Sequence, residues 1–228
     1  GDAHGQFRGF LDVDDDIRSA VDQLLQQQPG LDEVVLWGEC DASSAILLYA
    51  HRDPRVKGVV LLNPWVRTEA VAAQTILRFY YLHRVLQPSF WKKLVSGKLN
   101  PWTAARSLWR LLQQSRAAGR AATRARGHAG DATAGPALGA PIPRELALPD
   151  GLLIGWQRFA GPVMLVLSGR DLIAREFDVL TRSSDTWRAA VARPTLRRHD
   201  LPNGDHTFSS AEQRGTVVGW GLDWLRSW

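Results

Sequence analysis

The stretch Val34-Val35-Leu36-Trp37-Gly38-Glu39-Cys40-Asp41-Ala42 contains the single cysteine of this 228-residue chain. The apolar run 34–37 predicts a short strand, and the segment 42–51 predicts a helix. Cys40 stands between two small residues, Gly38 and Ala42, which suit a tight and strained turn from strand to helix. Such a turn exposes its central side chain above a sheet, with the N-terminus of the following helix behind it.

Two interpretations of Cys40 are open. A thiol at a helix N-terminus has its pKa lowered by the helix dipole, so more of it is the nucleophilic thiolate. A lone cysteine is also, in many proteins, a small buried apolar residue. The rest of the chain favours the first interpretation.

Helices and strands alternate along most of the chain, which predicts an α/β fold. The strands at 34–37 and 56–62 are nearly all apolar, as in a mostly parallel sheet that helices cover on both faces. Further strands are expected at 163–167 and, at the sheet edge, 195–201. Helices are expected at 12–28, 42–51, 152–159, 177–192 and 211–228.

The segment 65–158 interrupts this pattern and is predicted to be a helical cap insertion, with helices at 70–86, 90–95 and 103–125. A linker rich in glycine, alanine and proline follows at about 127–149. The insertion separates two parts of the core, residues 1–64 with the cysteine turn and residues 159–228.

Positive charge is concentrated in this insertion. Of the net charge of +5, residues 67–126 contribute +11, so the rest of the chain sums to −6. An anionic partner would fit, such as an acidic glycan, a phosphorylated lipid carrier or a membrane surface. A solvated helical face is the other interpretation. Nucleic acid is not expected, because no known binding module is present.

The composition indicates the kind of cellular compartment in which the protein is expected. One cysteine excludes an intrachain disulfide framework and fits a reducing compartment. There is no apolar run of about 18 residues and no visible signal peptide, so we expect a cytoplasmic protein. The oligomeric state is open. No metal or other cofactor is expected.

A cysteine nucleophile needs a base, and the base needs a partner that orients it. Asp171 comes just after the strand 163–167, and His206 lies in a turn after the strand 195–201. Catalytic groups of parallel sheets gather at the carboxyl ends of the strands. We therefore predict that Cys40 is the nucleophile, Asp171 the acid and His206 the base.

Each of these roles has a competing interpretation. Asp171 could cap the helix that begins at Leu172, and His206 could be an ordinary surface histidine. Other candidates for the acid are Asp178, Asp200 and Asp205.

Other groups complete the predicted site. The backbone N–H of Asp41, directly after the nucleophile, is expected to donate to the oxyanion. Aromatic residues around the insertion are candidates for substrate binding. They are Trp65, Tyr80 and Trp91, and the alternative is that they pack within the cap. Glu39, next to the nucleophile, could raise the pKa of the thiol by charge repulsion.

These motifs together resemble the α/β-hydrolase superfamily, in which the turn at residues 38–42 corresponds to the nucleophile elbow and serine is the usual nucleophile. The opening GDAHG, GECDAS around Cys40, LLNPWV at 61–66, SGRDLIAREF at 168–177 and NGDHTFS at 203–209 resemble the type 1 hydrolases associated with the bacterial exosortase A system. The resemblance spans nearly the whole chain. The elbow, GRD and GDH are its specific parts.

The resemblance implies the same three residues as a catalytic triad, and an exopolysaccharide setting. It also implies that early strands and an outer oxyanion donor are missing at the N-terminus. We expect a hydrolase that cleaves an ester, lactone or thioester of a small, lipid-linked or glycan-linked acyl substrate through an acyl-enzyme. An acyltransferase to a glycan hydroxyl and a non-catalytic binding protein on the same fold are the alternatives.

Overall fold

One sheet of parallel strands organises the residues that the computed structural model describes, 12–66 and 139–228. Its strands, in spatial as well as chain order, are β1 (Val34–Glu39), β2 (Val56–Leu62), β3 (Val163–Ser168) and β4 (Leu196–Leu201). Paired positions include Gly38 with Leu61, Leu62 with Val166, and Ser168 with Leu201. The carboxyl ends of all these strands therefore lie along one edge of the sheet.

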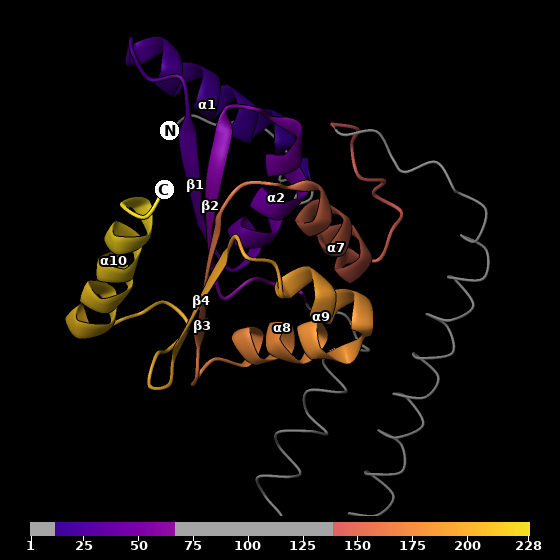
Figure 1. The fold of residues 1–228 in the computed structure, drawn as a ribbon, viewed down its shortest axis with the longest axis vertical. Helices are drawn as coiled ribbons and strands as arrows, with labels where there is room; N and C mark the ends of the chain where they lie inside the picture. The colour runs from indigo at the N-terminus through magenta and orange to yellow at the C-terminus, as the bar shows by residue number, and fades with distance from the viewer. Residues whose placement is uncertain (1–11, 67–138) are drawn as a thin grey trace, which may run out of the picture. The chain divides into compact units, whose positions relative to one another are not determined.

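Helices lie on both faces of the sheet (Figure 1). On one face lies α10 (Ala211–Leu225). On the other lie α2 (Asp41–Tyr49), α7 (Leu148–Arg158), α8 (Leu172–Ser183) and α9 (Asp185–Val191). In addition, α1 (Asp14–Gln27) packs against α2, and the short 3-10 helix η2 (Ala50–Arg52) continues α2. The predicted α/β architecture, a parallel sheet flanked by helices, is confirmed.

Burial of the strands explains their apolar composition. Every residue of β3 is buried, and in β2 Lys57 alone is exposed. No residue of β4 is fully buried, and Arg197 and Asp200 are exposed, as expected at an edge. Between the sheet and α10 lies one apolar cluster, made of Val60, Leu62, Met164, Val166, Phe208, Val217 and Trp224.

An aromatic cluster packs on the opposite face. Trp156 of α7, Phe177 of α8 and Trp187 of α9 are almost fully buried, and their ring centroids lie 6.1–6.4 Å apart. Arg193 donates hydrogen bonds to the carbonyl oxygens of Trp156 and Phe159 at the end of α7. These bonds satisfy carbonyls that the end of a helix leaves without partners.

The segment before the last strand differs from the sequence prediction of one helix at 177–192. Two helices form instead, α8 and α9, because Ser184 between them is extended (φ −142°, ψ 157°) and its hydroxyl caps α9 at the N–H of Trp187. The first helix begins at Leu172, five residues before the helix predicted at 177–192, because the Asp171 carboxylate caps it, as the alternative interpretation of this residue proposed.

The described end of the predicted insertion belongs with the sheet. Contacts divide the chain into residues 1–66 with 137–228, and residues 67–136. Within the first unit α7 packs against α2, although residues 148–158 were assigned to the cap from the sequence. The predicted helices at 70–86, 90–95 and 103–125, and the linker up to residue 138, lie outside the described residues.

A buried ionic cluster joins α2 to β2. The Asp53 carboxylate accepts hydrogen bonds from the Tyr49 hydroxyl at 2.5 Å and from the Arg55 guanidinium at 2.7 and 2.8 Å. The Arg55 hydrogen bonds hold the pKa of Asp53 well below its ordinary value. Burial, together with the neighbouring Asp53, raises the pKa of Tyr49 to about 12. This cluster fixes the end of the helix whose beginning carries Cys40.

Candidate active site

Cys40 lies in a strained turn between β1 and α2. Its backbone has φ 57° and ψ −120°, a region that side chains with a Cβ rarely adopt and that costs on the order of 1–3 kcal/mol. A Cβ at Gly38 would lie 2.7 Å from Ile46 Cδ1, 2.8 Å from the Ala42 carbonyl carbon and 2.9 Å from the Ser43 nitrogen. The close start of α2 therefore requires glycine at position 38.

Hydrogen bonds from β2 and the residues after it hold this turn. The Cys40 N–H donates to the Leu62 carbonyl at 2.9 Å, and the Trp65 N–H donates to the Cys40 carbonyl at 3.1 Å. The buried Ser43 hydroxyl donates to the Gly38 carbonyl at 2.7 Å and accepts from the Leu62 N–H at 3.0 Å. The strained conformation is thus fixed on both sides of Cys40.

The sequence prediction for the Cys40 thiol was wrong in direction. Burial raises the pKa of the thiol above its ordinary value, and the charges of Asp41, Asp171 and Glu39 raise it further. The Asp41 N–H acts the other way, because its hydrogen bond stabilises the thiolate. The helix N-terminus is therefore outweighed by burial and neighbouring carboxylates, and the thiol form is favoured at rest.

His206 and Asp171 meet at the same edge of the sheet. The His206 Nδ1 lies 2.9 Å from the Asp171 Oδ2. Asp171 is 7% exposed, whereas the His206 side chain is 37% exposed. A proton on Nδ1, shared with the carboxylate, leaves Nε2 with a lone pair for another group.

The carboxylate of Asp171 also caps α8, so it is both the N-terminal cap of this helix and the hydrogen-bond partner of the His206 ring. Its Oδ1 accepts from the Ile173 N–H and its Oδ2 from the Ala174 N–H, each at 3.2 Å. Two backbone donors fix the carboxylate, and the carboxylate in turn fixes the imidazole. The charge of Asp171 also reaches Cys40, since it raises the pKa of the thiol.

A solved structure that is similar along the whole chain identifies the fold. An esterase from Pyrococcus furiosus matches with a TM-score of 0.54 at 11% identity, over 100% of this chain and 66% of the esterase. The fold is that of the α/β-hydrolases. A monoacylglycerol lipase from Paleococcus ferrophilus is also similar, with a TM-score of 0.48 at 16% identity over 98% of this chain and 76% of the lipase. No protein-family model matches the sequence, and no curated protein matches it.

At these identities the comparison establishes the fold and not the reaction. The chain also spans slightly less than two thirds of the length of the Pyrococcus esterase. Within the α/β-hydrolase fold, the strand that leads to Cys40 and the two strands that precede Asp171 and His206 all end at one edge. The chemistry of this chain must be argued from these side chains.

The competing acids have other partners. Asp178 pairs with Arg182 at 3.0 Å and Arg198 at 2.8 Å, and Asp200 also pairs with Arg198. Asp205 accepts from the N–H and hydroxyl of Ser209. In the described residues, Asp171 is the carboxylate that hydrogen-bonds the His206 ring.

Glu39 places a further carboxyl group beside the site. Its Oε1 is buried and has no hydrogen-bond partner among the described residues. Burial raises the pKa of Glu39, the charge of His206 lowers it, and the charges of Asp171 and Asp205 raise it. The carboxyl group of Glu39 therefore interacts electrostatically with His206 and Asp171, in addition to the adjacent thiol of Cys40.

The predicted substrate-binding residues are only partly described. Trp65 is partly buried, and its backbone is tied to the nucleophile turn, because its N–H bonds the Cys40 carbonyl and its own carbonyl accepts from the Ser44 hydroxyl at 2.6 Å. Tyr80 and Trp91 lie outside the described residues. The structure therefore places one of the three beside Cys40.

Sequence reasoning missed Asn63, the residue after β2. It is fully buried and hydrogen-bonds both Ser168 and the backbone of His206. The available signal was a polar amide directly after a buried apolar strand, at the edge where catalytic groups gather.

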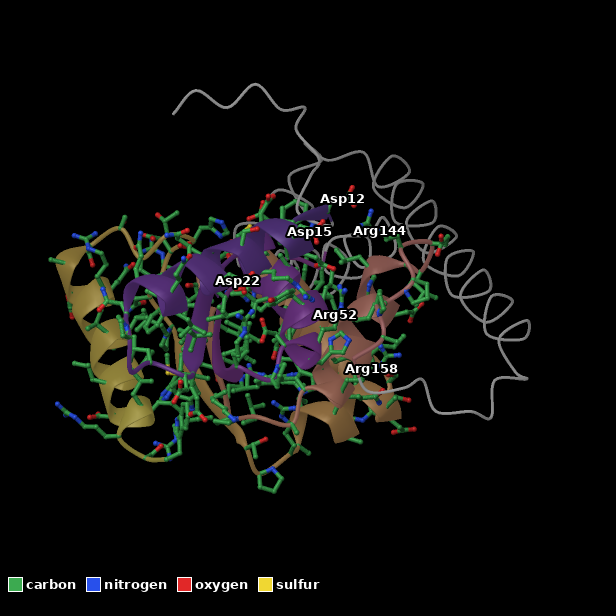
Figure 2. The ribbon with its side chains drawn as sticks, turned by 90° about the horizontal axis from the view of Figure 1, so that it is seen from above. Asp12, Asp15, Asp22, Arg52, Arg144 and Arg158 are labelled. Carbon is green, nitrogen blue, oxygen red and sulfur yellow. The ribbon has the colours of Figure 1, made fainter. Side chains whose placement is uncertain are left out.

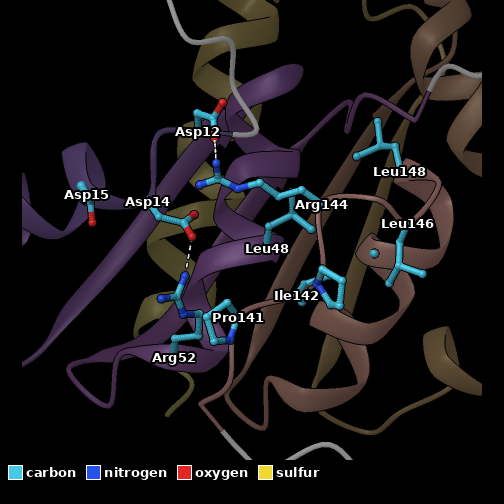
Figure 3. A pocket seen from close by; sticks show the side chains of 12 residues that line it. Asp12, Asp14, Asp15, Leu48, Arg52, Pro141, Ile142, Arg144, Leu146 and Leu148 are labelled. Carbon is cyan, nitrogen blue, oxygen red and sulfur yellow. Dashed lines mark hydrogen bonds and ion pairs between the residues drawn. The ribbon is translucent and has the colours of Figure 1, made fainter. Parts of the chain in front are cut away.

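A separate pocket lies among α1, α2 and the residues before α7 (Figure 3). Arg52 pairs with Asp14 and Arg144 pairs with Asp12 across it. Viewed from above, Asp12 and Arg144, which form one of these pairs, lie close together (Figure 2). None of the three predicted catalytic residues lines this pocket.

Within residues 12–66 and 139–228, no group of three or more histidine, cysteine, aspartate and glutamate side chains is placed to hold a metal ion. No helix in these ranges has the length and apolar character needed to cross a membrane.

Proposed function

We propose that this protein is a hydrolase that cleaves esters, lactones or thioesters through a covalent acyl intermediate on Cys40. The observation that carries the proposal is the 2.9 Å contact between His206 Nδ1 and Asp171, at the sheet edge where a strained turn presents Cys40. Esterase and lipase structures with the same fold agree with this class of reaction.

In this mechanism His206 acts as a general base toward a neutral thiol. Because burial keeps the pKa of Cys40 above its ordinary value, the thiol needs a base at the moment of attack. The Cys40 sulfur bonds to the substrate carbonyl carbon while the thiol proton passes to His206 Nε2. Asp171 holds the ring by its other nitrogen and stabilises the imidazolium.

The intermediate then collapses. The Asp41 N–H, directly after Cys40 at the start of α2, would donate to the oxyanion. The leaving alkoxide or thiolate takes the proton from His206, and a thioester of Cys40 remains. Water attacks this thioester, His206 accepts a proton from the water, and the carboxylic acid departs as Cys40 regains its proton.

The proposal also includes the class of substrate and the place of the reaction in the cell. The motifs shared with hydrolases of the exosortase A system support an acyl substrate linked to a bacterial exopolysaccharide or its lipid carrier. The basic segment 67–126 agrees with an anionic substrate or surface. We place the reaction in a reducing compartment such as the cytoplasm, because the chain has a single cysteine.

Incubation with p-nitrophenyl acetate and p-nitrophenyl butyrate, followed by intact mass measurement, tests the reaction. We expect an acyl adduct on the parent protein, none on Cys40→Ala, and slowed formation on His206→Ala. Asp200→Asn is the matched control, because this carboxylate pairs with Arg198 and not with the histidine. A folded parent with neither adduct nor turnover would contradict the proposal. An adduct that water does not release, but a sugar hydroxyl does, would favour the acyltransferase alternative.

A further inference from the structure

Asn63 occupies a demanding position directly after β2. Its backbone is left-handed, with φ 46°, and its side chain is fully buried. Asparagine tolerates this backbone region better than most residues other than glycine. A buried amide must find partners for its oxygen and its nitrogen, so its hydrogen bonds explain why it is there.

The amide joins two other segments of the chain. Its Oδ1 accepts from the Ser168 N–H at 2.8 Å, and its Nδ2 donates to the Ser168 hydroxyl at 3.0 Å. The same Nδ2 donates to the His206 carbonyl at 2.9 Å. One side chain thus connects the end of β2 with the end of β3 and with the backbone of the predicted base.

The residues on either side of Asn63 are bonded to the nucleophile turn. The Leu62 carbonyl accepts from the Cys40 N–H, and the Trp65 N–H donates to the Cys40 carbonyl. The segment 62–65 therefore contacts the backbone of Cys40 on one side and that of His206 on the other. No residue of this short segment needs to touch a substrate to affect the reaction.

We propose that Asn63 is a positioning residue, which holds the imidazole of His206 in register with Cys40 through the backbone carbonyl of His206. This inference rests on the proposed function, because the register matters only if these two side chains react together. Misplacement of reacting groups by about 1 Å costs about 100-fold in rate, so one hydrogen bond to this loop carries a measurable effect.

The His206 loop has a second support that Asn63 does not share. The Arg170 N–H donates to the Gly204 carbonyl at 3.0 Å, two residues before the histidine. The Asp171 carboxylate orients the ring, whereas Asn63 holds the backbone from which the ring projects. Loss of Asn63 should therefore displace the base without unfolding its loop.

Two variants of Asn63 test the hydrogen bond from its amide to the His206 carbonyl. Asn63→Gly keeps the left-handed backbone without strain and removes the amide. Asn63→Asp keeps the acceptor for the Ser168 N–H but has no hydrogen to donate to the His206 carbonyl. Ser168→Ala is the matched control, because it is equally buried and loses a bond to Asn63 while the bond to His206 remains.

The first measurement separates kcat from KM with p-nitrophenyl butyrate, at equal folded fraction. We expect kcat to fall about 100-fold in both Asn63 variants, KM to stay near the parental value, and Ser168→Ala to lose only a few-fold. Parental kcat in Asn63→Gly would overturn the inference. So would equal losses in Asn63→Gly and Ser168→Ala, because these would indicate a purely structural role.

A second measurement does not depend on ester turnover. The rate of Cys40 alkylation by iodoacetamide, followed across pH, reports how well His206 assists loss of the thiol proton. Both Asn63 variants should approach the profile of His206→Ala, and Ser168→Ala should keep the parental profile. If the parent turns over no ester but this pattern appears, the proposed function fails and the positioning role stands. If the Asn63 variants alkylate like the parent, the positioning role fails.

Discussion

The nucleophile turn and the His206 loop lie at the same sheet edge but are built in different ways. Residues 38–42 form a turn in which Gly38 must clear the first turn of α2, a steric requirement between neighbours in sequence, and backbone hydrogen bonds with Leu62 and Trp65 then hold it. The His206 loop depends on partners far along the chain, the carboxylate of Asp171 and the amide of Asn63. The nucleophile turn therefore has a local steric requirement in addition to its long-range hydrogen bonds, whereas the base is placed by long-range hydrogen bonds.

The largest expected effect on activity comes from a substitution at Asp171, which removes a long-range contact of the His206 loop. In Asp171→Asn the single amide oxygen still caps α8 but accepts from only one of the two N–H groups that the carboxylate binds, and the negative charge beside His206 is lost. We expect kcat to fall by up to about 10⁴-fold, while the free energy of unfolding falls by only about 1 kcal/mol. Steady-state kinetics together with denaturant unfolding checks this, and Asp178→Asn is the control. An equal loss of stability and activity would contradict it.

A substitution at Gly38 disrupts the nucleophile turn, where the constraint is a steric one between neighbours in sequence. In Gly38→Ala the new Cβ meets backbone atoms of Ala42 and Ser43 at less than 3 Å, so α2 must shift. We expect the free energy of unfolding to fall by about 1–3 kcal/mol, with loss of acylation. Gly215→Ala on α10 is the matched control, because a Cβ there meets no atom within 4 Å and alanine favours helix. A Gly38→Ala protein as stable as the parent would show that the turn is not sterically determined.

Lowering the pH tests the contacts at the far end of α2, where the Asp53 carboxylate binds Tyr49 and Arg55. The pKa of Asp53 is depressed in the folded state, so its contribution to stability is present above the unfolded value of about 3.9. The contribution is lost as the pH falls toward the folded value. We expect Asp53→Asn to cost about 1–3 kcal/mol at neutral pH.

The difference between Asp53→Asn and the parent should narrow as the solution is acidified below about pH 4. Urea unfolding at several pH values measures it. Asp185→Asn, at an exposed carboxylate, provides the control. A difference that stays constant down to low pH would contradict the role of the Asp53 charge.

The smallest expected effect is at Glu39, whose charge interacts both with the thiol of Cys40 and with His206. Its charge is the last of several causes that raise the pKa of Cys40. Glu39→Gln should therefore lower the pKa of the thiol slightly and move the onset of alkylation to lower pH. Iodoacetamide labelling across pH measures the change, with Glu33→Gln as the control. A shift in the opposite direction would show that Glu39 assists His206 more than it repels the thiolate.

Much of the architecture could be predicted from local pattern. The strand 56–62 and the turn at Cys40 were located closely, because apolar runs and small residues act on their immediate neighbours. The helix break at Ser184 was missed, because it depends on a side-chain cap, and the start of α8 at Leu172 was present only as the alternative interpretation of Asp171. The packing of α7 against α2 was missed as well, since nothing in its own sequence indicates its partner.

By itself, the sequence determined the α/β pattern, the strand–turn–helix around Cys40 and the chain order of the three candidate residues. These depend on side-chain size, apolar periodicity and backbone freedom, which are local properties. Tertiary structure alone decided that Asp171 contacts His206, that Asn63 reaches the His206 carbonyl, and that the pKa of Cys40 is raised and not lowered. Burial and hydrogen bonding between distant segments exist only once the strands have assembled, so no local pattern encodes them.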